Sequence, residues 1–202
     1  NLAVEEKKIK NKNFLNQANF IPNGSTALLD ATGKTIESVE VRRRDLRWEI
    51  PGEFEEVLAE QKLESFRLVG KYLVLDLPNK QSIIGHLGMS GTFRVESQMP
   101  DELRKHDHVI LHMDSAQVAI FNDPRRFGAF LWVDGEMASH KLLCDLGPEP
   151  LSEQFTTDYL YQRSRGRKVA IKNFIMNGHV VVGVGNIYAS EALFMAGIHP
   201  QR

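Results

Sequence analysis

The sequence of 202 residues has very little cysteine and no long apolar run. Its single cysteine, Cys144, excludes an internal disulfide bond and a multi-cysteine metal site in the chain. No run approaches the roughly 20 apolar residues that a membrane-spanning helix needs, and no secretory leader opens the sequence, so we expect an intracellular protein. The first residue is Asn1 rather than Met, which is typical of a processed chain or a fragment. With 42% hydrophobic and 25% charged residues, the composition is that of a folded protein rather than a disordered or fibrous one.

The charge of the chain is close to neutral, at −1, but its distribution is uneven. No acidic residue occurs between Asp158 and Glu191, and a separate basic run lies at Arg42–Arg44. Local positive density attracts phosphates, whatever the average charge. A run of charges is also typical of a solvated helix face, and the pattern alone leaves both interpretations open. The basic residues of the acid-free stretch are Arg163, Arg165, Arg167, Lys168 and Lys172.

From Thr35 the pattern favours short strands separated by turns. An apolar strand over Leu68–Leu77, a turn at Pro78-Asn79 and a strand over Ser82–Leu87 predict an antiparallel hairpin. Many short strands in succession predict an antiparallel sandwich or barrel over about residues 35–150. Other expected elements are strands at Ile36–Val41, Asp107–Met113, Gln117–Asn122 and Gly128–Val133, and a short helix at Glu53–Gln61.

The pattern becomes helical after Leu146–Pro150, over residues 151–202, so the fold class is α+β with the sheet first. Residues 1–34 show no strong period and are expected to be partly helical around Thr26–Asp30. The expected C-terminal helices start at Leu151–Phe155, span Lys168–Asn177 with Gly178 as C-cap, and run from Asn186 as N-cap to Ala196.

Several short motifs point to chemistry, although none decides it alone. The turn Gly183–Asn186 has two interpretations: its backbone N–H groups bind an anion, or it is a tight turn that only connects two packed helices. The turn Asp123–Gly128 carries two arginines and a phenylalanine, which suit either a wedge into a base stack or an ion-paired hairpin. Met89 lies between glycines on a loop, an unusual place for a core side chain. Lys71 lies in an apolar strand, where burial lowers a lysine pKa unless the side chain reaches solvent.

Six segments, in this order, resemble the formamidopyrimidine-DNA glycosylase family over about Thr35–Pro200. The resemblance implies an antiparallel β-sandwich followed by the opening of a helix–two-turns–helix domain. It also implies a base-excision repair glycosylase and abasic-site lyase acting on oxidised purines in duplex DNA. The matching segments are Gly70–Leu73, Ile84–Gly91, Lys105–Val109, Asn122–Gly128, Leu146–Leu151 and Val181–Glu191.

The same resemblance assigns roles to individual residues. Members of the family flip the damaged base out of the duplex and fill the gap with side chains, which here are Met89, Arg125 and Phe127. Lys71 matches a lysine that contacts phosphate and takes part in strand cleavage. The implied partner is damaged or abasic duplex DNA, bound by a monomer in a DNA-containing compartment. Five residues match positions at which the family contacts the DNA backbone: His106, Arg125, Arg167, Lys172 and Asn186.

The chain also departs from the family pattern. Members begin with a Pro-Glu pair whose amine attacks the sugar, whereas here the first residue is Asn1 and the first proline is Pro22. We therefore expect this polypeptide to have lost most or all glycosylase activity. The family binds one structural zinc through four C-terminal cysteines, so with Cys144 alone we expect no cofactor here. The alternatives are a non-catalytic remnant that binds damaged DNA, and an incomplete gene product with unrelated first 34 residues.

Overall fold

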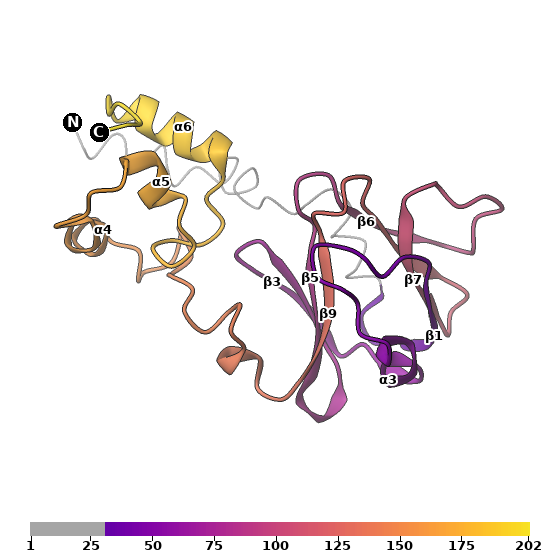
Figure 1. The fold of residues 1–202 in the computed structure, drawn as a ribbon. Coiled ribbons are helices and arrows are strands. Elements are labelled where there is room, and N and C mark those ends of the chain that lie inside the picture. Colours follow the sequence, from indigo (N-terminus) through magenta and orange to yellow (C-terminus); the bar gives the residue numbers. More distant parts are fainter. Residues whose placement is uncertain (1–30) are drawn as a thin grey trace.

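The computed structural model describes residues 31–202, which form a two-layered β structure followed by three helices (Figure 1). The helices α4 (Thr157–Ser164), α5 (Ile171–Ile175) and α6 (Asn186–Met195) gather at one side of the sheets. This order confirms the α+β class. The expected helix around Thr26–Asp30, with most of the segment 1–34, lies outside the described residues.

The β part consists of two antiparallel sheets, as the hairpin pattern predicts. The five-stranded sheet has the order β2-β1-β7-β8-β6, and the four-stranded sheet has the order β3-β4-β5-β9. The strands of the first sheet are β1 (Thr35–Val41), β2 (Gln61–Lys62), β6 (Thr92–Glu96), β7 (Asp107–Met113) and β8 (Val118–Asn122). Those of the second are β3 (Ser65–Val69), β4 (Tyr72–Asp76), β5 (Gln81–His86) and β9 (Ala129–Asp134).

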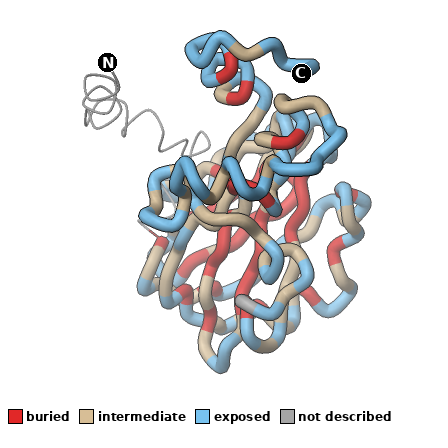
Figure 2. Tube along the Cα trace, turned by 90° about the vertical axis from the view of Figure 1, so that its left-hand side faces the viewer, coloured by how far each residue is buried: buried red, intermediate tan, exposed pale blue. Residues whose placement is uncertain are grey.

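The core between the sheets is rich in phenylalanine. The Phe130 ring stacks on Phe93 and Phe121, with centroids 5.8 and 5.7 Å away. Phe54, from the short helix α3 (Phe54–Leu58), meets Phe130 edge-on at 5.6 Å. Aromatic pairs at such distances add to the stabilisation from burying their area. Figure 2 shows buried residues along the strands, whereas the helices carry mostly exposed residues.

The outer faces of both sheets are covered as well, which explains why several strands are almost continuously apolar. Ile110 and Ile120 pack with Leu103 of the β6–β7 loop. Ile84 packs with Met137 of the 3₁₀ turn η3 (Met137–Ser139), so the chain after β9 belongs to the sandwich. Strands that are buried on both faces lack the alternation of apolar and polar residues that is typical of strands with one face in solvent.

The expected strand Leu68–Leu77 is wrong, because two strands and a turn occupy this stretch. Gly70 has a φ of 59°, the left-handed conformation that glycine adopts without steric cost, and it turns the chain from β3 into β4. Lys71 therefore lies at the tip of a hairpin and not within a strand. A Cβ at Gly70 would stand 3.0 Å from Val182 Cβ, so the tip packs against the helical part. Strand β6 was not expected from the sequence.

Two of the expected C-terminal helices have different bounds. Residues Leu151–Phe155 form turns, and α4 begins later because the Thr156 hydroxyl caps it by accepting a hydrogen bond from Tyr159 N at 3.0 Å. Helix α5 is shorter than expected and ends at Met176 as its C-cap, so Gly178 does not have the expected capping role.

The last helix agrees with expectation except at its caps. Gly185, and not Asn186, is the N-cap of α6, and Ala196 is its C-cap. Gly197 follows with a φ of 67°, the left-handed conformation common after helix ends. The expected helix Glu53–Gln61 is the shorter α3. None of the helices within residues 31–202 has the length and apolar character that crossing a membrane requires.

Candidate nucleic-acid interface

Two loops that pass between the sheets lie side by side at one end of the sandwich. The β5–β6 loop leaves the four-stranded sheet at His86, and the β8–β9 loop leaves the five-stranded sheet at Asn122. His86 pairs with Ala129 in one sheet and Thr92 pairs with Asn122 in the other, so both loops start and end on neighbouring strands. Antiparallel pairing thus joins residues that are 43 and 30 positions apart in the sequence.

Glycine lets these loops approach so closely. Gly88 has a φ of 64°, and a Cβ there would lie 2.7 Å from the carbonyl carbon of Phe127. A Cβ at Gly128 would lie 2.7 Å from the Phe121 ring and 2.8 Å from the His86 carbonyl oxygen. Atoms cannot pack at such distances, so both positions require glycine.

A buried carboxylate ties the two loops together. Asp123 is fully buried and accepts hydrogen bonds from Ser90 Oγ at 2.9 Å and from Gly128 N at 2.7 Å. Its backbone oxygen accepts from Nε2 of His108 at 2.9 Å, which links the loops to β7. A buried carboxylate that is satisfied in this way holds its surroundings in one arrangement.

The loops carry the three side chains predicted to fill a gap in DNA, and the structure brings all three together. An Arg125 guanidinium nitrogen lies 3.5 Å from Met89 Sδ, and its central carbon lies 4.6 Å from the centre of the Phe127 ring. Met89 is 75% exposed and Phe127 is 46% exposed. We call Met89, Arg125 and Phe127 the wedge cluster: two large apolar groups and a cation that project into solvent on a braced support.

Lys71 lies at a contact between the β part and the helical part. Its Nζ donates a hydrogen bond to the Val184 carbonyl at 3.0 Å, and Gly70 N donates to Glu149 Oε1 at 3.0 Å. A hollow of about 150 Å³ lies at this junction, and we call it the interdomain pocket. It is lined by Gly70–Tyr72, His86, Leu146, Met176, Gly178 and Val181–Val184.

The N-terminus of α6 lies beside Lys71. A Cβ on Gly185, the N-cap, would lie 3.7 Å from Lys71 Nζ, and Asn186 is the exposed first residue of the helix. Gly183 turns the chain before it with a φ of 76°. The partial positive charge of the helix end thus adds to that of the ammonium group.

His86 is a site residue that the sequence analysis did not single out, although it lies in one of the family segments. Burial, with smaller effects from Arg47 and Lys71, lowers the pKa of His86, so its ring is neutral at pH 7. Its Nδ1 accepts a hydrogen bond from Gly88 N at 3.0 Å, which leaves the proton on Nε2. Partial burial also lowers the pKa of Lys71. The pocket is therefore lined by two side chains that can donate hydrogen bonds, the Lys71 ammonium and the His86 Nε2–H.

His106 belongs to a second and larger hollow, of about 400 Å³, on the side of the five-stranded sheet. We call it the basic hollow. Asp123 N donates to the His106 carbonyl at 3.0 Å, so this hollow adjoins the support of the wedge cluster. The basic hollow is lined by Arg42, Arg43, Lys105, His106, Asp107, His108, Pro124 and Arg126.

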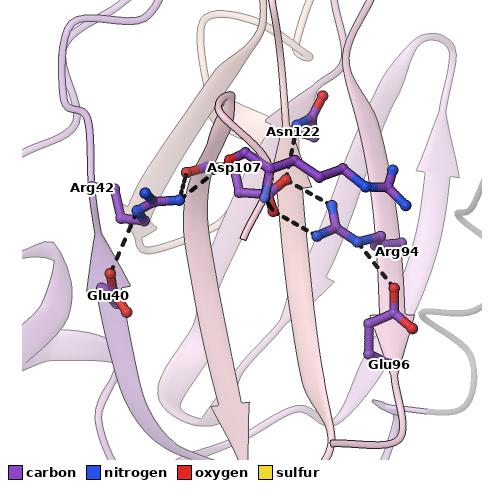
Figure 3. Close-up of polar contacts among 7 residues, drawn as sticks. Glu40, Arg42, Arg94, Glu96, Asp107 and Asn122 are labelled. Atoms are coloured by element: carbon purple, nitrogen blue, oxygen red, sulfur yellow. Dashed lines mark hydrogen bonds and ion pairs between the residues drawn. The ribbon is translucent and has the colours of Figure 1, made fainter. Parts of the chain in front are cut away.

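Asp107, beneath this hollow, is held by several donors (Figure 3). Arg94 contacts both carboxylate oxygens, at 2.7 and 2.6 Å, and Asn122 Nδ2 donates at 2.8 Å. Burial alone would raise the pKa of Asp107, but these bonds and one from Arg104 N outweigh it and lower the pKa to about 2. The carboxylate is therefore charged and fully bonded at neutral pH.

The other two predicted contact residues lie in the helical part. Arg167 is exposed between α4 and α5, and its Nε donates to the Arg163 carbonyl at 3.3 Å. Lys172 lies half-buried on α5. Residues 31–202 hold no group of three His, Cys, Asp or Glu side chains that could share a metal ion.

Comparison with known proteins agrees with this architecture. The family model for the formamidopyrimidine-DNA glycosylase N-terminal domain matches residues 25–130, and the model for the helix–two-turns–helix domain of the same enzymes matches residues 146–202. The fold is therefore a β-sandwich joined to a helix–two-turns–helix region. The chain belongs to the formamidopyrimidine-DNA glycosylase family.

Individual relatives cover most of the chain. It is 52% identical over 172 residues to the formamidopyrimidine-DNA glycosylase of Thioalkalivibrio sulfidiphilus, covering 85% of this chain and 62% of the relative. The Pectobacterium carotovorum enzyme is 54% identical, with coverage of 83% and 61%. The chain thus spans less than two thirds of the length of these relatives.

Solved structures of the Lactococcus lactis enzyme share the fold. One, bound non-covalently to DNA with an AP site, has a TM-score of 0.77 and 26% identity, covering 85% of this chain and 65% of that one. Another, in complex with DNA that contains Fapy-dG, has a TM-score of 0.77 and 27% identity, with coverage of 85% and 64%.

Proposed function

We propose that this chain binds duplex DNA at an oxidised purine or an abasic site, as the DNA-binding part of a formamidopyrimidine-DNA glycosylase and AP lyase. The observation that carries the proposal is the wedge cluster on its glycine-dependent, Asp123-braced loops, close to the cationic interdomain pocket. Relatives of known structure bind AP-site and Fapy-dG DNA, which supports the same partner here. We infer a monomer in a DNA-containing compartment.

The wedge cluster accounts for base extrusion. Side chains that enter a base stack unstack it at a cost of a few kcal/mol per step and bend the duplex. The exposed Met89 and Phe127 side chains already lie out of the core, so their burial against bases offsets part of that cost. Arg125, stacked on Phe127, brings a cation that pairs with base edges or phosphates.

The interdomain pocket accounts for holding the extruded nucleotide. The Lys71 ammonium, the Nε2–H of His86 and the N–H groups at the start of α6 all donate to anions, and a nucleotide outside the stack exposes its flanking phosphates. In the proposal Lys71 contacts a phosphate beside the lesion and takes part in strand cleavage. His106, Arg167, Lys172 and Asn186 contact the bent backbone.

A second candidate function is damage-specific DNA binding without catalysis. Its basis is that residues 31–202 provide the wedge cluster and a pocket suited to phosphate, which bind DNA without forming a covalent bond to it. Both candidates make the same DNA contacts, so binding alone does not separate them.

Two measurements test the proposal. In fluorescence anisotropy, the 202-residue chain should bind a duplex that contains an abasic analogue at least about tenfold more tightly than the intact duplex, because less stacking is lost at such a site. Equal affinity for the two duplexes would contradict the proposal. Borohydride trapping on an abasic duplex then separates the candidates: a covalent adduct shows an amine-dependent lyase, and specific binding without an adduct shows the non-catalytic binder.

A further inference from the structure

The basic hollow contains an arginine run that the proposed function does not use. Arg42 and Arg43 follow the end of β1 and line the hollow together with Lys105 and Arg126. Four permanent cations thus surround one hollow of about 400 Å³. Such a concentration of like charge repels itself, and an anion in the hollow relieves the repulsion.

The acidic groups nearby do not cancel this charge. Asp107 is already neutralised by Arg94. Asp45 is shared between Arg43, at 2.6 Å, and Arg126, and Glu40 reaches Arg42 only at 3.7 Å. Among residues 31–202, no carboxylate forms an ion pair with Lys105. The lining therefore keeps an excess positive charge.

Two sets of contacts hold these cations in place at the hollow. Arg42 donates hydrogen bonds to the carbonyls of Arg104 at 3.4 Å and Asp107 at 3.2 Å, which fix its guanidinium at the hollow's edge. Arg126 has a φ of 58°, a conformation that costs a non-glycine residue about 1 kcal/mol, and its ion pair with Asp45 compensates for that cost. Arg44 of the same run points elsewhere, since it bonds to Glu55 at 2.5 Å.

The position of the basic hollow indicates which strand of a bound DNA duplex it faces. The wedge loops pass between the sheets, with the interdomain pocket beside β4 and β5 on one side and the basic hollow beside β1 and β7 on the other. Side chains that enter a DNA groove lie between the two backbones that border it. If the extruded nucleotide's strand occupies the interdomain pocket, the second backbone runs past the basic hollow.

We propose that Arg42 and Arg43, in the basic hollow, bind backbone phosphate of the strand opposite the lesion. This inference rests on the proposed function and adds a second grip on the duplex. In this proposal Arg42 and Arg43 increase the affinity for duplex DNA of any sequence, whereas the wedge cluster supplies the preference for damaged DNA.

Salt dependence tests the proposal. Binding to the abasic-analogue duplex is measured from about 50 to 200 mM NaCl, where each phosphate contact contributes about 0.9 to the slope of log K against log salt. The double variant Arg42→Ser/Arg43→Ser should lower the slope by about 1 to 2, with an affinity loss of about 8-fold per lost contact at about 0.1 M salt. Its ratio of affinities for abasic and intact duplex should stay that of the wild type.

Matched variants separate charge from folding. Arg42→Lys/Arg43→Lys keeps both charges and should retain the wild-type slope. Arg67→Ser/Lys80→Ser removes two ion-paired cations from the β3–β5 hairpins and should leave the slope unchanged. The inference is overturned if the serine double variant keeps the wild-type slope of log K against log salt. It is also overturned if the lysine double variant shows the same decrease in slope as the serine variant. If the wild-type chain itself shows no preference for the abasic duplex, the proposed function fails first.

Neutral methylphosphonates, placed one at a time, identify the strand. One such replacement opposite the lesion should weaken the wild-type chain by about 8-fold and leave Arg42→Ser/Arg43→Ser unaffected, because the variant has already lost that contact. The assignment to the opposite strand is overturned if the only methylphosphonates whose effect disappears in Arg42→Ser/Arg43→Ser are those in the strand that carries the lesion.

Discussion

Asp107→Asn removes a carboxylate that has no contact with solvent and is bonded from three sides. The Asp107 side chain is 0% exposed, and that of its partner Arg94 is 15% exposed. The amide keeps the shape of the carboxylate but loses its charge, so the Arg94 guanidinium keeps only one counter-ion, Glu96 at 3.1 Å.

The size of the effect follows from the lowered pKa. Asp107 has a pKa of about 2 when folded, against 3.8 for an aspartate side chain in water, and each unit is worth about 1.4 kcal/mol, so the charged form contributes about 2 kcal/mol at pH 7. Because Arg94 then pairs with Glu96 alone, the cost rises toward about 3 kcal/mol, the lower end of the range for a broken buried ion pair. Since the folded pKa is the lower one, the contribution is present above about pH 4, is about half lost at pH 3 and is mostly lost at pH 2.

Urea unfolding at several pH values measures this difference. The stability gap between the wild type and Asp107→Asn should be largest at neutral pH and should narrow by about 1 kcal/mol at pH 3. The exposed Asp101→Asn serves as control and should change stability by less than about 0.5 kcal/mol. A gap that stays constant from pH 7 to pH 3 would refute the role of the charged carboxylate.

Three further predictions concern the loops and the pocket. Gly88→Ala should destabilise the protein by more than Gly166→Ala, which has a similar φ of 68° but open space around its Cβ and so should cost only about 1 kcal/mol in denaturant unfolding. Met89→Ser should reduce the preference for the abasic duplex several-fold and leave the melting temperature unchanged, because the side chain is 75% exposed; an unchanged preference would count against the wedge. Acylation followed by mass spectrometry should show Lys71 losing its proton at lower pH than Lys80, since burial lowers the pKa of Lys71 whereas Glu136 raises that of Lys80; the reverse order would contradict the geometry of the pocket.

Elements whose pattern is local were predictable from the sequence. The strand Asp107–Met113 has its expected bounds, and the hairpin ending in β5 is confirmed. The turn at Gly70 was missed because apolar residues on both sides of it favour one continuous strand. Helix ends were misplaced where a neighbouring residue competed for the cap, as Gly185 does with Asn186. Short-range propensities decide such boundaries only weakly.

The sequence by itself determined the family, the order of sheet and helices, and which residues to examine at the site. Only the tertiary structure decided that Met89 and Phe127 share one surface, that Lys71 is at a hairpin tip against α6, and that Arg42 and Arg43 line a hollow while Arg44 turns away. The physical reason is that residues distant in sequence meet through strand pairing across two sheets, and whether a cation is free or neutralised depends on which carboxylates the fold brings to it.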